Sequence, residues 1–139
     1  MAGKETALIV GAGQGLSASL ARLFASEGMQ VAIAARNTDK LAGLCSETGA
    51  KAFACDAGHP AQVNALFDAV TGEMGEPDIV VYNASNRARG PVQGLDVEAV
   101  RTAIEISCYG GFLVAQAAAK QMIPRGSGTI LLTGASASV

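Results

Sequence analysis

A glycine-rich segment near the N-terminus has residue types that could hold a phosphate. It reads GAGQGLS from Gly11 to Ser17 and lies between the apolar run 7–10 and a helical pattern. Glycines at such a turn let backbone N–H groups approach a phosphate without interference from Cβ atoms, and the following helix N-terminus adds partial positive charge. The GxGxxG pattern fails at its last position, Leu16, and no Gly-Lys-Ser/Thr follows. The alternative is a glycine turn that only packs a helix on a sheet.

A second candidate for ligand chemistry is Arg36, which follows the apolar run 31–34 and Ala35 and precedes Asn37. In a dinucleotide site, the residue at the end of the second strand contacts the adenosine ribose. A carboxylate there would accept a hydrogen bond from a free 2′-OH, whereas a guanidinium suits the 2′-phosphate of NADP through charge-assisted hydrogen bonds. The alternative is a solvated arginine at a helix start. Because the glycine segment lies in the expected place upstream, we favour NADP over NAD.

The elements that must position these residues alternate regularly along the chain. Short apolar runs predict strands, and segments of period 3.6 between them predict helices. Such alternation is typical of a parallel sheet with right-handed crossovers and helices on both faces. We expect strands at 7–10, 31–34, 51–54, 78–82 and 129–133, and helices at 17–27, 38–48, 60–74 and 97–122.

The composition fits one compact domain and excludes several other classes of protein. The 139 residues are 50% hydrophobic and only 4% aromatic, with a net charge of −2, so the chain is not intrinsically disordered. Ten basic against twelve acidic residues give no basic field for nucleic acid or an anionic membrane. No apolar run reaches the roughly 18 residues needed to span a bilayer.

Cysteine usage and the N-terminal residues point to a reducing compartment. The three cysteines are widely spaced without a CxxC pair, which is typical of buried thiols rather than a disulfide framework or a metal site. The first residues lack the basic, apolar and small-residue regions of a secretory signal. We therefore expect a cytoplasmic protein with no metal site.

Five short motifs occur in the order and spacing found in one family of enzymes. They are Gly11-xxx-Gly15, Ala35-Arg36, Cys55-Asp56-Ala57, Tyr82-Asn83-Ala84-Ser85 and the strand after Gly128. Over essentially its whole length the chain resembles the N-terminal half of a short-chain dehydrogenase/reductase. The resemblance implies an α/β fold of Rossmann type, a doubly wound parallel sheet of about five strands in the order 3-2-1-4-5. Residues 1–139 would then form a single NAD(P)-binding domain that ends before the family's catalytic Tyr and Lys.

The resemblance also assigns cofactor-binding roles. It places backbone around Gln14 near the cofactor phosphates, the carboxylate of Asp56 at the adenine amino group, and Arg36 at the position that favours NADP. For Asp56, the alternative is a helix cap near Pro60. The cofactor-binding residues implied are Gly11, Gln14, Gly15, Leu16, Arg36, Asn37, Asp56, Ala57, Asn83, Ala84 and Ser85.

The catalytic positions of the family are altered in this sequence. The family's catalytic Asn aligns to Ser107, and its catalytic Ser aligns to Ala135, with Ser136 one residue later. By resemblance, Ser136 could polarise a substrate oxygen and Ser107 could hold a water. The alternative for both is an ordinary helix or loop hydroxyl. Tyr82 is expected on a buried strand and Tyr109 inside a helix, so neither replaces the family's catalytic Tyr.

Two functions follow from the resemblance. The first is an NADP-dependent oxidoreductase that transfers hydride between the nicotinamide and a carbonyl or alcohol substrate. The alternative is an NADP-binding module with little or no turnover, such as a sensor, an interaction protein or an inactive fragment. In either case the resemblance implies a homo-oligomer formed through the helix 97–122, and neither nucleic acid nor a membrane is an expected partner.

Overall fold

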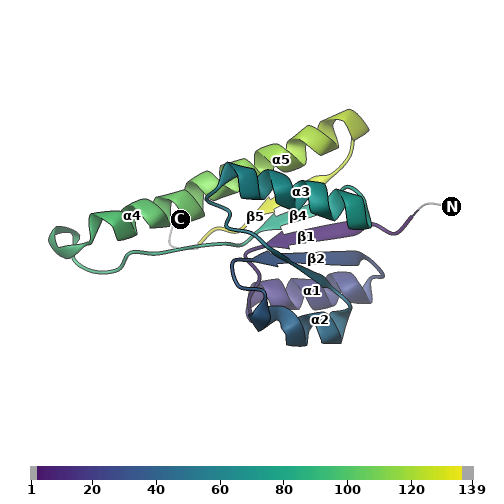
Figure 1. The fold of residues 1–139 in the computed structure, drawn as a ribbon, viewed down its shortest axis with the longest axis horizontal. Coiled ribbons are helices and arrows are strands. Elements are labelled where there is room, and N and C mark those ends of the chain that lie inside the picture. The colour runs from purple at the N-terminus through teal and green to yellow at the C-terminus, as the bar shows by residue number, and fades with distance from the viewer. Residues whose placement is uncertain (1–2, 136–139) are drawn as a thin grey trace.

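The sheet has the predicted strand order. In the computed structural model, which describes residues 3–135, a five-stranded parallel sheet runs in the order β3-β2-β1-β4-β5 (Figure 1). Its central strand β1 pairs with β2 on one side and with β4 on the other. The strands are β1 (Thr6–Val10), β2 (Gln30–Ala35), β3 (Lys51–Ala54), β4 (Ile79–Tyr82) and β5 (Thr129–Leu132).

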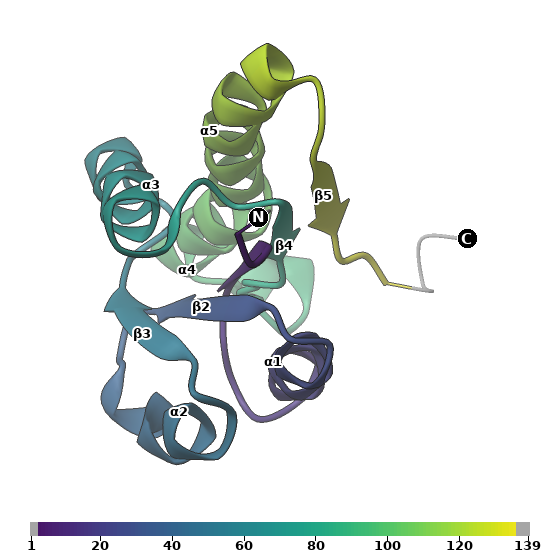
Figure 2. The ribbon, with the colours of Figure 1, turned by 90° about the vertical axis from the view of Figure 1, so that its right-hand side faces the viewer.

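Helices cover both faces of this sheet. Figure 2 shows α1 and α2 on one side and α3 and α5 on the other. Because side chains alternate along a strand, Leu8 and Val10 of β1 face α3 and α5, whereas Ile9 between them faces α1 and α2. The helical elements are α1 (Leu16–Ser26), η1 (Asp39–Leu41), α2 (Ala42–Thr48), α3 (Pro60–Met74), η2 (Val92–Gly94), α4 (Val97–Ile104), η3 (Glu105–Tyr109) and α5 (Gly110–Arg125).

The sequence predicts a long helix over 97–122 that is interrupted at Gly110-Gly111; in the structure the interruption is at Glu105–Tyr109, and the second helix begins at Gly110. The first part begins at Val97 as predicted, with the Asp96 carboxylate accepting a hydrogen bond from the Ala99 N–H at 2.9 Å. A π-helical turn, η3, then separates α4 from α5. The second part runs through Pro124 to Arg125, because a proline in the last turn removes only one intrahelical hydrogen bond, and Gly126 ends the helix in the left-handed region.

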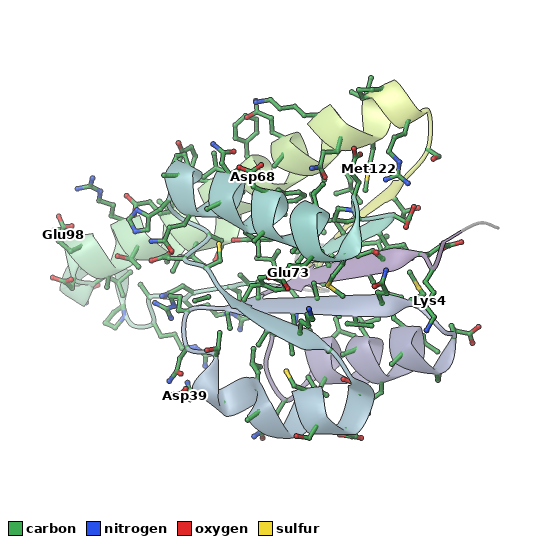
Figure 3. The ribbon with its side chains drawn as sticks, turned by 45° about the vertical axis from the view of Figure 1, so that its right-hand side comes forward. Lys4, Asp39, Asp68, Glu73, Glu98 and Met122 are labelled. Carbon is green, nitrogen blue, oxygen red and sulfur yellow. The ribbon has the colours of Figure 1, made fainter. Side chains whose placement is uncertain are left out.

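Several charged side chains lie on the outer surface, and apolar side chains fill the space between the helices and the sheet. Asp39, Asp68 and Glu98 are exposed on the outer surfaces of the helical segments, whereas Met122 lies between α5 and the sheet (Figure 3). Within residues 3–135, none of the helices combines the length and the apolar character that crossing a membrane requires.

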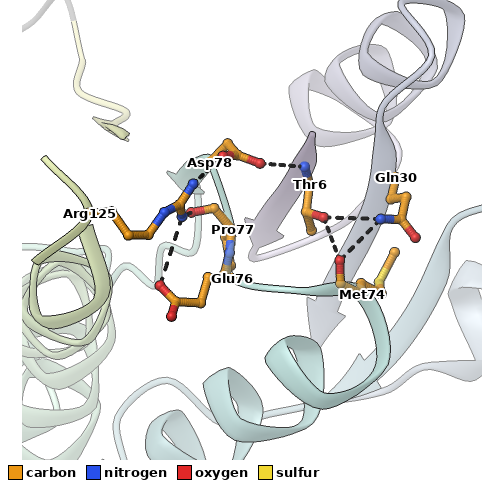
Figure 4. A network of polar contacts seen from close by, with 7 residues as sticks. All are labelled: Thr6, Gln30, Met74, Glu76, Pro77, Asp78 and Arg125. Carbon is orange, nitrogen blue, oxygen red and sulfur yellow. Dashed lines mark hydrogen bonds and ion pairs between the residues drawn. The ribbon is translucent and has the colours of Figure 1, made fainter. Parts of the chain in front are cut away.

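A polar network closes the amino edge of the sheet (Figure 4). The Asp78 carboxylate accepts hydrogen bonds from the Thr6 N–H at 2.8 Å and from the Arg125 guanidinium at 2.5 Å. The Thr6 hydroxyl and the Gln30 amide both donate to the carbonyl of Met74, at 2.8 and 3.1 Å. These bonds tie the ends of α3 and α5 to the starts of β1, β2 and β4, so polar groups at this edge are committed to the fold.

Candidate functional site

A cleft of about 540 Å³ lies at the carboxyl edge of the sheet. In open α/β sheets ligands bind at this edge, at the point where the strand order reverses. Here that point lies between β1 and β4. The cleft is lined by Val10, Gly11, Ala12, Ala35, Arg36, Asn37, Lys40, Cys55, Asp56, Ala57, Asn83, Ala84, Ser85 and Ile106.

The structure brings most of the predicted cofactor-binding residues together in this cleft. Gln14, Gly15 and Leu16 are the exceptions: they do not line it but lie exposed at the start of α1. Sequence reasoning did not assign a role to Lys40 or Ile106, which also line the cleft. The signal available for Lys40 was its spacing, four residues after Arg36, so that a single turn can bring both cations to one place.

Gly11 is required by a close approach between β1 and β4. Its φ of +92° lies in the region that favours glycine. A Cβ built there would lie 2.5 Å from Ala84 Cα and 2.7 Å from the carbonyl carbon of Asn83. Around Gly13 and Gly15, by contrast, a Cβ would meet no atom within 4 Å. The segment thus combines one structural glycine with two that face open space.

The N-terminus of α1 is open to an anion. Gly15 occupies the cap position without a side-chain hydrogen bond, and the first turn contains no acidic residue. The first N–H groups of a helix have no intrahelical partner and carry partial positive charge. In the described part of the chain, nothing competes with an anion for those of α1.

Ser17 ties the glycine segment to β4. This side chain is only 1% exposed. Its hydroxyl accepts a hydrogen bond from Asn83 Nδ2 at 2.8 Å and donates one to the Gly11 carbonyl at 3.0 Å. The Asn83 N–H donates in turn to the Val10 carbonyl at 2.8 Å. The Ser17 hydroxyl therefore fixes the end of β1 against the end of β4.

The Ser17→Ala variant is expected to lose about 1–3 kcal/mol of unfolding free energy, because the Asn83 amide and the Gly11 carbonyl each lose a partly buried partner. Urea denaturation measures the change. Ser26→Ala is the matched control in the same helix, since its exposed hydroxyl bonds only the Leu23 carbonyl and its loss should change stability by less than about 0.5 kcal/mol. Equal stabilities of the two variants would contradict this role of Ser17.

Asp56 forms the turn after β3 as well as part of the cleft. Its Oδ1 accepts a hydrogen bond from the Gly58 N–H at 3.1 Å, and its Oδ2 lies 3.3 Å from His59 Nε2. The N-terminal cap of α3 is His59 rather than Asp56, and Pro60 follows it in the first turn. The carboxylate retains lone pairs for a ligand, since each oxygen can accept two hydrogen bonds.

Two buried protic groups near Asp56 stay protonated at neutral pH. Burial, and then the Asp56 carboxylate, raise the pKa of the Cys55 thiol to about 11. Burial first, with smaller contributions from Cys55 and Asp56, raises the pKa of the Tyr82 hydroxyl to about 12. Tyr82 donates its proton to the Ile106 carbonyl. Neither side chain is therefore poised for acid or base chemistry near neutral pH.

Of the two serines predicted for catalysis, the structure describes only Ser107. Ser107 Oγ accepts a hydrogen bond from the Asn86 N–H at 3.0 Å and donates to the Asn86 carbonyl at 2.9 Å. Its single proton is thus committed, and a lone pair remains for a water. Ser136 lies outside the described residues. Across residues 3–135, no group of three or more His, Cys, Asp or Glu side chains is arranged to hold a metal.

Comparisons with known proteins agree in sequence and in structure. The model of the short chain dehydrogenase family matches residues 5–139. A D-threitol dehydrogenase of Mycolicibacterium smegmatis is 32% identical over 132 residues, covering 91% of this chain and 51% of that protein. A galactitol 2-dehydrogenase of Agrobacterium fabrum is 34% identical over 136 residues, covering 95% and 52%. The chain spans about half the length of the curated relatives it matches.

Among solved structures, an F189W actinorhodin polyketide ketoreductase with NADPH superposes with a TM-score of 0.88 at 29% identity, over 93% of this chain and 52% of that one. A metagenomic short-chain oxidoreductase in complex with NADP gives a TM-score of 0.87 at 28% identity, over 92% and 61%. A short-chain type dehydrogenase/reductase of Mycobacterium marinum gives 0.86 at 37% identity, over 94% and 56%.

Proposed function

The chain belongs to the short-chain dehydrogenase family, and we propose that it binds NADP(H) in the cleft at the carboxyl edge of its sheet. In the whole protein this would be the cofactor-binding part of an oxidoreductase that acts on an alcohol or a carbonyl compound. The observation that carries the proposal is that two cations, Arg36 and Lys40, line that cleft and form no ion pair with any other residue of 3–135.

The two cations favour a phosphate on the adenosine ribose. Among the described residues, neither Arg36 nor Lys40 forms an ion pair, although both line the cleft. A phosphate monoester carries a charge of about −1.5 to −2 near neutral pH, which two cations can balance. Asp56, the acidic residue that lines the cleft, follows β3, the strand paired with β2, and is therefore not at the end of β2 where Arg36 lies.

A free 2′-OH would find a poorer partner at the same place. The residue after Arg36 is Asn37, and its Oδ1 already accepts a hydrogen bond from the Asp39 N–H at 3.0 Å. The carboxylate that typically accepts from the 2′-OH of NAD is absent at the end of β2. These contacts support NADP over NAD.

The remaining residues suit the other parts of a dinucleotide. The uncapped N-terminus of α1 and the open space at Gly13 and Gly15 suit the pyrophosphate. The Asp56 carboxylate could accept a hydrogen bond from the adenine amino group. The chemistry that such a cofactor supplies when bound is hydride transfer to a carbonyl or from an alcohol. For Ser107, we propose a role in holding the loop after β4 in place.

Apolar side chains on the outer surface of α4 and α5 suit contact with a second copy of the chain. Val97, Ile104 and Phe112 are all exposed there. Contiguous exposed apolar surface is typical of interaction sites. We propose that the whole protein is a homo-oligomer that uses these helices.

Cofactor binding to the purified chain tests the proposed function. We expect NADPH to bind at least about tenfold more tightly than NADH in calorimetric titrations, since one charge-assisted hydrogen bond is worth about 1.5–3 kcal/mol. 2′,5′-ADP should compete with NADPH more strongly than 5′-ADP does. Equal affinity for NADPH and NADH would contradict the NADP preference. No binding of either at millimolar concentration would contradict the proposed site.

A further inference from the structure

The π-helical turn η3 changes the hydrogen-bond register between α4 and α5. The Gly110 N–H donates to the carbonyl of Glu105, five residues earlier. In an α-helix the same N–H would donate to the carbonyl of Ile106. A π-turn contains one residue more than an α-helical turn, so it rotates the preceding residues by about 100° relative to the following helix.

The carbonyl of Ile106 instead accepts a hydrogen bond from a residue of the sheet. Tyr82, the last residue of β4, donates its hydroxyl proton to it. This tyrosine is only 4% exposed, and its pKa of about 12 keeps the hydroxyl a donor across the physiological range. The hydrogen bond joins residues that are 24 positions apart, so it is a tertiary contact and not part of the helix.

Two glycines bring α5 close enough for this contact. A Cβ on Gly110 would collide with the Tyr82 hydroxyl and lie 3.0 Å from the carbonyl oxygen of Ala57. A Cβ on Gly111 would lie 3.4 Å from Tyr82 Cδ2. The start of α5 therefore packs directly on the tyrosine ring.

The residues of the turn serve two neighbouring surfaces. Ile106 lines the cleft, as do Asp56 and Ala57. The next residue, Ser107, forms both of its hydrogen bonds with the backbone of Asn86, in the loop that joins β4 to α4. A change of register at Ile106 would rotate both side chains away from these contacts.

We propose that Tyr82 is a positioning residue, whose hydroxyl fixes the π register and thereby sets Ile106 in the cleft wall and Ser107 beneath the loop after β4. Without the hydroxyl, the Ile106 carbonyl lacks this partner, and the α-helical register, in which the Gly110 N–H pairs with it, becomes the better arrangement. The consequence for the cleft rests on the proposed NADP(H) binding, whereas the consequence for Asn86 does not.

Amide hydrogen exchange in the chain without cofactor tests the coupling. The Asn86 N–H is protected by Ser107 Oγ. In Tyr82→Phe we expect this amide to exchange about three- to tenfold faster, the fold-change equivalent to one net hydrogen bond. Ser107→Ala should give the same acceleration directly. Tyr109→Phe is the matched control, because it removes a hydroxyl from a 43% exposed tyrosine of the same turn and should leave Asn86 unchanged.

A merely structural role of Tyr82 gives a different result. A general loss of stability accelerates the slowest core amides, such as that of Val81, but leaves an amide that exchanges by local opening unchanged. If Asn86 exchanges as slowly in Tyr82→Phe as in the wild type, while Ser107→Ala accelerates it, the proposal is wrong.

NADPH titration of the same variants tests the cleft wall. We expect Tyr82→Phe to weaken NADPH binding by about three- to tenfold relative to Tyr109→Phe, because the displaced Ile106 no longer packs on the ligand. Unchanged affinity would overturn the effect on the cleft. If the wild type binds no NADPH, the proposed function fails, and the exchange experiment still decides whether Tyr82 sets the turn.

Discussion

Replacing Gly11 by alanine is expected to lower the free energy of unfolding by about 2–6 kcal/mol, a large part of the stability of a domain this size. Two effects add at this position. A φ of +92° is strained for any residue with a Cβ, and the Cβ itself would lie 2.5 Å from Ala84 Cα. The atoms that the Cβ would meet belong to the backbone of Asn83 and Ala84, just after β4, and backbone cannot move away as a flexible side chain can. Urea denaturation followed by circular dichroism measures the loss.

The matched control for this substitution lies two residues later. Gly13→Ala places its Cβ where no atom lies within 4 Å, at a φ outside the left-handed region, so its stability should stay within about 1 kcal/mol of the wild type. A Gly11→Ala chain as stable as Gly13→Ala would mean that β1 and β4 separate easily. In that case the close approach of β1 and β4 in the cleft would not depend on the glycine at position 11.

The fold could be predicted because its signals are local and repeated. Each buried strand is a short apolar run, and each helix carries its own period and end signals, so alternation along the chain indicates the doubly wound sheet. The strand order came from the family resemblance, and the structure confirms it. The amino-edge bonds of Asp78 to Thr6 and Arg125 have no such signal, since their partners are 72 and 47 residues away.

The π-turn could not be predicted from the local sequence pattern. Residues 97–122 have a helical pattern whose only predicted interruption is at Gly110-Gly111, and nothing in it indicates a change of register that begins at Glu105. The partner that accompanies the change is Tyr82, which comes from a strand. Only the packing of α5 on the sheet, through Gly110 and Gly111, brings the two together.

The candidate site shows the same division. Arg36 could be predicted because its place at the end of the second strand has a chemical meaning in dinucleotide sites. Lys40 was not predicted, because its spacing from Arg36 is a weak signal and a lysine at the start of a helix is usually solvated. The short turn η1 places it at the cleft beside Arg36. The hydrogen bond between Ser17 and Asn83 could not be predicted either, because it depends on how the end of β4 packs against the end of β1.

Removing the two cations is expected to have the largest effect on cofactor binding. Each of Arg36→Ala and Lys40→Ala should weaken NADPH binding by about 10- to 100-fold, the equivalent of a charge-assisted hydrogen bond worth about 1.5–3 kcal/mol. NADH affinity should change little in either variant, because NADH has no 2′-phosphate. The double variant should bind NADPH and NADH about equally. Calorimetric titration at fixed ionic strength measures the NADPH and NADH affinities of the wild type and of each variant.

Lys120→Ala is the control for net charge, since this exposed lysine of α5 lies outside the cleft and its loss changes the charge by the same amount. Because Arg36 and Lys40 are exposed, salt should screen their attraction for the phosphate. The preference for NADPH over NADH should therefore fall as ionic strength rises in the wild type and be independent of salt in the double variant. A double variant that still prefers NADPH would place the 2′-phosphate elsewhere than at the end of β2.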